Sequence, residues 1–77
     1  MNKSRRERLK DSIPMLSKLM GIIESIRDEE QESLDSLPDN LSESERAMRM
    51  EEIIDSLDEA CSNLDDINTT INDIIYG

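Results

Sequence analysis

The residue types that most often carry catalysis are scarce in this chain of 77 residues. It contains no histidine and one cysteine, Cys61, so a thiol nucleophile would have no imidazole base beside it. Carboxylates are plentiful, as in "RDEEQE" (27–32) and at Asp65 and Asp66. They could in principle hold a metal ion, but di-iron helical bundles need histidine and the calcium-loop motif is missing. We therefore interpret the acids as a solvated face and expect no enzymatic activity, no metal and no cofactor.

The single cysteine also bears on the compartment. It can form neither an internal disulfide nor a zinc site, which favours a reducing, intracellular setting. The basic start is followed by a charged segment without a small-residue cleavage site, so we expect no signal peptide. No apolar run approaches the length that spans a bilayer, and we expect no membrane partner.

Basic residues at the start of the chain form the one cluster with a clear binding chemistry. They set five positive charges against Glu7 alone, about +4 in a chain of net charge −10, which leaves about −14 elsewhere. Such a segment could bind the phosphates of nucleic acid, nucleotide or lipid, although it has no aromatic residue for base stacking. Alternatively it is a solubilising terminus, or it neutralises the acidic body of a partner subunit. The candidate anion or partner contacts are Lys3, Arg5, Arg6, Arg8 and Lys10.

The elements that would position these residues are helices. Apolar residues make up 35 % of the chain, Val, Phe and Trp are absent, and Tyr76 is the single aromatic. Leu, Ile and Met among many Glu, Arg and Lys favour helices over sheets. The composition predicts an all-α fold whose order depends on the apolar pattern and on association.

A heptad pattern covers the second half of the chain. Its a positions are Ile54, Cys61, Asn68 and Ile75, and its d positions are Met50, Leu57, Leu64 and Ile71, with Ala47 one heptad before Ile54. A third column, at g, holds Ile53, Ala60, Ile67 and Ile74. Three apolar columns in seven are typical of a helix inside a bundle. This phase makes Cys61 a small buried hydrophobe and Asn68 a polar core residue that specifies register and oligomeric state.

The first half repeats the pattern with interruptions. One series runs through Leu9, Ile13, Leu16, Met20 and Ile23, is interrupted by Arg27 and Glu30, and continues at Leu34 and Leu37. A second series, offset by one residue, is Met15, Leu19, Ile22 and Ile26. A single partner helix cannot cover both series. Gly21 is unfavourable in a helix interior, which indicates the close approach of a neighbouring helix.

Pro14 leaves two interpretations of how this helix begins. Ser12 could be the N-cap of a helix with Pro14 in its first turn. Alternatively a kinked helix begins near Ser4, which the heptad phase of Leu9 favours.

The stretch "LDSLPDNLSESER" (34–46) separates the two halves. Pro38 ends the first helix, and Asp39 and Asn40 suit a turn. Ser42 and Glu45 match a capping box that starts the second helix. We predict a basic arm or kinked helix start at 1–11, a helix at 12–37, a turn at 38–41 and a helix at 42–76, forming one antiparallel hairpin domain.

Folding the chain at this turn pairs residues whose numbers add to about 79. Arg27 then comes within reach of Asp55 or Asp58, and Glu30 within reach of Arg49, which would fix the register. The second apolar series stays uncovered, so we expect dimerisation into a four-helix bundle. The predicted oligomer interface consists of Met15, Leu19, Ile22, Ile26, Ile53, Ala60, Ile67, Asn68 and Ile74.

The segment Ile26–Ile67 resembles a group of small helical proteins of phages and mobile elements of Gram-positive bacteria. Their pattern "LPxNLxxSER" is matched by Leu37, Pro38, Asn40, Leu41, Ser44, Glu45 and Arg46, and departs where Ala47 replaces a glycine. The resemblance implies a helical hairpin and a bacterial or phage cytoplasmic origin, and no activity.

The function expected from the sequence is protein–protein contact by a self-associating structural or interaction protein. The alternative is a phage-type inhibitor. It would bind a host factor through its acidic surface, or sequester a nucleotide or nucleic acid with its basic arms.

Overall fold

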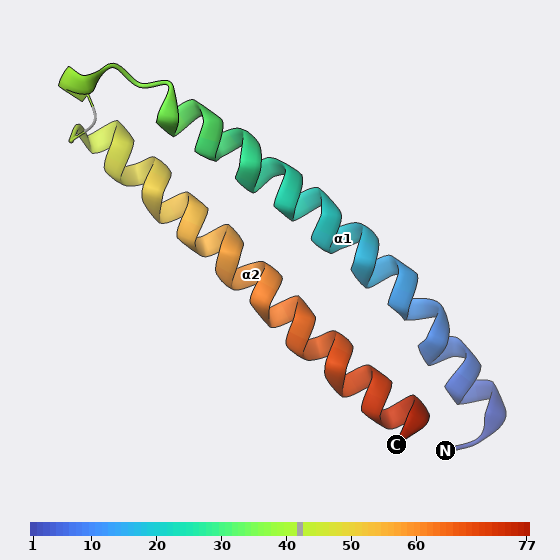
Figure 1. Cartoon of the computed structure of the whole chain (residues 1–77). Coiled ribbons are helices and arrows are strands. Elements are labelled where there is room, and N and C mark those ends of the chain that lie inside the picture. Colours follow the sequence, from blue (N-terminus) through green and yellow to red (C-terminus); the bar gives the residue numbers. More distant parts are fainter. Residues whose placement is uncertain (42) are drawn as a thin grey trace.

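The computed structural model describes residues 1–41 and 43–77, and these form two long helices connected by a short turn. Helix α1 (Lys3–Asp35) and helix α2 (Glu45–Tyr76) lie side by side and run in opposite directions, so both termini lie at the same end (Figure 1). The hairpin measures 60 × 15 × 13 Å, and its described residues include no strand. The predicted antiparallel two-helix hairpin is confirmed.

Helix α1 begins much earlier than a helix capped by Ser12 would. Its N-cap is Asn2, whose side-chain Oδ1 accepts a hydrogen bond from the Arg5 backbone N–H at 2.8 Å. The helix continues through Pro14, while the Ser12 hydroxyl donates to the Leu9 carbonyl within it. The interpretation that starts the helix at Ser12 is therefore wrong. A helix from Lys3 keeps Leu9 in the apolar series, and packing against α2 overrides the local cost of proline.

The turn is longer than the predicted 38–41. Helix α1 ends at Asp35 with Ser36 as its C-cap, and a short 3₁₀ helix, η1 (Asp39–Leu41), precedes α2. The cap of α2 is Ser44, whose Oγ accepts from the Ala47 N–H at 3.2 Å. Helix α2 therefore begins at Glu45, later than the start predicted from the sequence. Ser42, the cap proposed from the sequence, lies outside the described residues.

One apolar seam joins the helices. Its buried side chains all belong to α2: Ala47, Met50, Ile54 and Ile75. The main apolar series from Leu9 to Leu37 is half-buried throughout, and no residue of α1 is buried. Two helices share only one line of contact, so most seam residues keep one side open to water. The hairpin alone therefore leaves much apolar surface exposed.

Candidate functional site

The most distinctive surface of the hairpin is an exposed apolar stripe along α1. Its members are the second series predicted from the sequence, with exposed fractions of 70 % for Met15, 44 % for Leu19, 49 % for Ile22 and 48 % for Ile26. They recur at steps of four, three and four residues, so they lie in one line along a helix. The structure leaves the predicted interface residues of α1 uncovered.

The g column of α2 is exposed at two of its four positions. Ile67 and Ile74 are 47 % and 50 % exposed, whereas Ile53 and Ala60 are half-buried beside the seam. Asn68, also predicted at the interface, lies in the a column of the seam and is half-buried. The predicted set thus divides into an outward stripe and one seam residue.

The two apolar columns lie on the same face of the hairpin. Each column precedes its own seam column by one residue, a rotation of about 100° around a helix of 3.6 residues per turn. Because α1 and α2 run in opposite directions, these two rotations point to the same side of the plane that contains both helices. We call the combined surface the apolar face: Met15, Leu19, Ile22 and Ile26 of α1 with Ile53, Ala60, Ile67 and Ile74 of α2.

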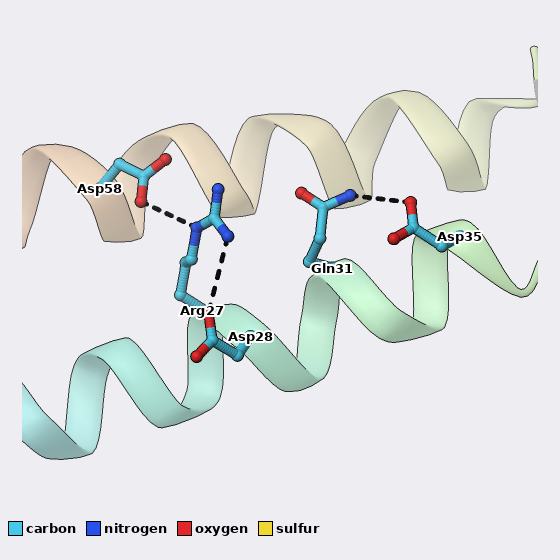
Figure 2. A network of polar contacts seen from close by, with 5 residues as sticks. All are labelled: Arg27, Asp28, Gln31, Asp35 and Asp58. Atoms are coloured by element: carbon cyan, nitrogen blue, oxygen red, sulfur yellow. Dashed lines mark hydrogen bonds and ion pairs between the residues drawn. The ribbon is translucent and has the colours of Figure 1, made fainter.

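A charged pair crosses the seam where the apolar series of α1 is interrupted. Arg27 Nε donates to Asp58 Oδ1 at 2.9 Å, and Arg27 Nη1 lies 3.6 Å from Asp28 on its own helix (Figure 2). The hydrogen bond and charge of Asp58 raise the pKa of Arg27, which stays protonated. The predicted contact of Arg27 with Asp58 is confirmed.

The other predicted pair across the helices does not form. Arg49 Nη1 lies 3.3 Å from Glu52 Oε2 of its own helix, and no ion pair joins it to Glu30 within the described residues. Side chains lean toward the N-terminus of their helix, so Glu30 leans away from the turn and Arg49 leans toward it. The numbers of Arg27 and Asp58 add to 85 rather than 79, and the same lean moves their two side chains toward each other. In an antiparallel pair of helices, long side chains therefore meet when their residue numbers add to a larger value than the numbers of residues whose backbones lie opposite each other.

A contact that was not predicted from the sequence joins the start of α1 to the end of α2. Lys10 Nζ lies 5.7 Å from the centroid of the Tyr76 ring, within the range of a cation–π interaction. The numbers of these two residues add to 86, close to the value for Arg27 and Asp58. A pairing rule corrected for side-chain lean would have found it.

Cys61 is half-buried in the seam, at its predicted a position. Burial, followed by the charges of Glu24 and Asp58, raises the pKa of its thiol. A thiol in this setting is a weak nucleophile at neutral pH. Its surroundings therefore suit a packing residue.

The basic segment is part of helix α1, and its side chains are mostly exposed. Lys10 lies 3.7 Å from Glu7, and an Arg6 Nη2 donates to the Met1 carbonyl at 3.5 Å. Lys3, Arg5 and Arg8 make no ion pair with any residue that the structure describes. These cations crowd the positive end of the helix dipole, where they are locally unfavourable.

The remaining surface offers no concave site. Across residues 1–41 and 43–77 there is no pocket and no group of three His, Cys, Asp or Glu side chains placed to hold a metal ion. Within the same residues, neither helix combines the length and apolar character needed to cross a membrane.

Comparisons with protein-family models, curated proteins and solved structures found no match to this chain. The apolar face and the basic segment are therefore the two features from which a function can be argued.

Proposed function

We propose that this protein is a non-enzymatic interaction protein that works by self-association, with a second copy covering its apolar face. The exposed line of Met15, Leu19, Ile22 and Ile26 carries the proposal. Apolar residues at helical spacing beside a second apolar column are typical of a bundle helix that lacks its neighbour.

The dimensions of the hairpin support the same conclusion. The apolar column of α1 spans residues 15–26, about 16 Å along the hairpin, and that of α2 spans residues 53–74, about 32 Å. A contiguous apolar patch of this kind marks an interaction site.

The test is the mass of the protein in solution by light scattering at micromolar concentration. The wild type is expected to be a dimer, and Leu19→Glu with Ile22→Glu is expected to be a helical monomer. Met48→Glu is the matched control, because Met48 is 52 % exposed and lies outside the apolar face. A wild-type monomer would overturn the proposal. So would a Met48→Glu variant that dissociates as far as the variant with Leu19→Glu and Ile22→Glu.

A second candidate function is binding of an anionic ligand by the basic segment. The observation in its favour is that Lys3, Arg5 and Arg8 are exposed on α1 and make no ion pair with a described residue. Binding of nucleotide or nucleic acid at low salt, lost in an Arg5/Arg6/Arg8→Ala variant, would support it. Absence of binding at low salt would leave self-association alone.

We propose that the protein comes from a phage or mobile element and acts in the bacterial cytoplasm. The resemblance of the turn sequence supports this proposal. The inhibitor reading, in which the acidic surface binds a host factor, belongs to the same proposal. Capture of a host protein by the wild type, lost when acidic residues of the turn half are neutralised, would support that reading.

A further inference from the structure

The charges of the hairpin are strongly polarised along its length. The half nearer the turn, residues 20–60, holds three basic and fourteen acidic residues, a formal charge of −11. The half nearer the termini, residues 1–19 and 61–77, holds six basic and five acidic residues, a formal charge of +1. Both termini lie at the end opposite the turn, so this division by sequence is also a division in space (Figure 1).

Two face-to-face arrangements of a dimer would cover the apolar face. With the turns at the same end, α1 of one copy lies on α2 of the other, and the two −11 halves lie against each other. With the turns at opposite ends, α1 lies on α1 and α2 on α2, and each acidic half lies against the half of charge +1. Like charges across an interface select against the first arrangement.

We infer that the partner is a second copy with its turn at the opposite end, so that the basic segment of each copy lies on the acidic turn half of the other. This inference rests on the proposed self-association and specifies its geometry. A two-fold axis would cross α1 between Leu19 and Ile22, placing Met15 opposite the partner's Ile26.

The apolar face is self-complementary about such an axis. On α1 the face is centred between residues 20 and 21, and on α2 it is centred between residues 63 and 64. These two centres add to about 84, close to the 85 of the Arg27–Asp58 contact. They therefore lie at nearly the same level of the hairpin. One axis consequently pairs Ile53 with Ile74 and Ala60 with Ile67 as well.

The same axis places unpaired charges of opposite sign together. Residues 3–10 come to the level of about residues 31–38 of the other copy, which include Glu32 and Asp35. Lys3, Arg5 and Arg8 have no ion-pair partner among the described residues, and neither do Glu32 and Asp35. The arrangement thus supplies anions to cations that are unfavourable at a helix N-terminus.

Disulfide trapping between single-cysteine chains tests the arrangement. In a Cys61→Ala background, chains carrying Met15→Cys are mixed with chains carrying Ile26→Cys and oxidised mildly. The mixed disulfide is expected to exceed either homodisulfide several-fold, because two copies of position 15 lie about 16 Å apart in this dimer, beyond disulfide reach.

A competing mixture distinguishes the alternatives. Met15→Cys with Ile67→Cys would be trapped if the turns lay at the same end, and Met48→Cys reports random collision. Preferential trapping of positions 15 and 67 in a dimer would overturn the inference while preserving self-association. The inference would also be overturned by a dimer in which the disulfide between Met15→Cys and Ile26→Cys chains forms no faster than the disulfide of Met48→Cys chains. A wild-type monomer would overturn both proposals and leave the apolar face to a different protein.

Discussion

Arg27 Nε lies 2.9 Å from Asp58 Oδ1 and joins the two helices at a point where the apolar seam is interrupted. Both side chains keep contact with water, with 33 % and 53 % exposed, so the pair gains little free energy from its charges. Its position suggests a different role. An arginine in the seam has one favourable partner across it, so this pair opposes sliding of one helix along the other.

Removing the pair should therefore change register more than stability. We expect Arg27→Leu, which extends the apolar seam, to leave the melting temperature equal to or above that of the wild type. Asp58→Ala should lower it by a few degrees, and 1 M salt should abolish that loss. Circular dichroism melts of both variants and of the double variant measure the coupling. A large loss of stability in Arg27→Leu would contradict the expectation.

Much of the hairpin could be predicted because a heptad pattern specifies which side of a helix is buried. Every α1 residue of the main series is half-buried, and the buried α2 residues all fall at a or d. The helix ends were harder, because several short polar residues near each end could act as the cap. Ser44 caps α2 although Ser42 with Glu45 also fits a capping box, and Asn2 caps α1 although Ser12 precedes Pro14.

The two apolar columns of the candidate surface could be predicted from the sequence, but their position on the same side of the hairpin could not. The sequence assigns Met15 and Ile67 to columns outside the seam. Antiparallel packing of the helices places both columns on one face. The hairpin also separates the charges of the sequence into an acidic half near the turn and a half of charge +1 near the termini. Glu30 and Arg49 do not pair although their numbers match, because a pairing of residue numbers ignores the direction in which side chains lean.

Gly21 should be replaceable without harm to the hairpin. A Cβ added there meets no atom within 4 Å, so the glycine does not serve close approach of α2. Gly21→Ala is expected to stabilise the helix by about 1 kcal/mol, which urea unfolding would measure. The position also lies away from the apolar face, so the mass in solution should not change. A weakened dimer would show that Gly21 contacts the second copy.

The Cys61 thiol should react slowly and only at high pH. Its raised pKa follows first from burial and then from the nearby charges of Glu24 and Asp58. The rate of alkylation by iodoacetamide should therefore rise at a higher pH in the folded protein than in the same chain in urea. Glu24→Gln should shift this rise slightly toward lower pH. Since the folded state favours the neutral thiol, this group costs stability only as the pH rises above the pKa of the unfolded thiol. Equal profiles in folded and unfolded protein would contradict the expectation.

Reversing charges in the basic segment should weaken the dimer without weakening the helix. Arg5→Glu, Arg6→Glu and Arg8→Glu together place acids at the positive end of the α1 dipole, which favours the helix. The same change sets acid against acid in the proposed dimer, so the dissociation constant should rise at least tenfold at low salt. Sedimentation equilibrium measures it, and the difference from wild type should shrink in 0.5 M salt. An unchanged dissociation constant would show that the basic segment does not contact the second copy.

Asn68 should contribute specificity at the expense of stability. It occupies an a position of the seam, is half-buried, and its side-chain amide makes no hydrogen bond to a described residue. The 2.8 Å bond from Asn72 Nδ2 reaches the Asn68 backbone carbonyl, so Asn68→Ile would lose no partner. Partial burial of the new side chain should add about 1 kcal/mol, or about 4–8 °C in melting temperature. With the polar constraint removed, light scattering should detect species larger than a dimer. If Asn68→Ile instead unfolds the protein, the amide fulfils a structural need that the hairpin alone does not reveal.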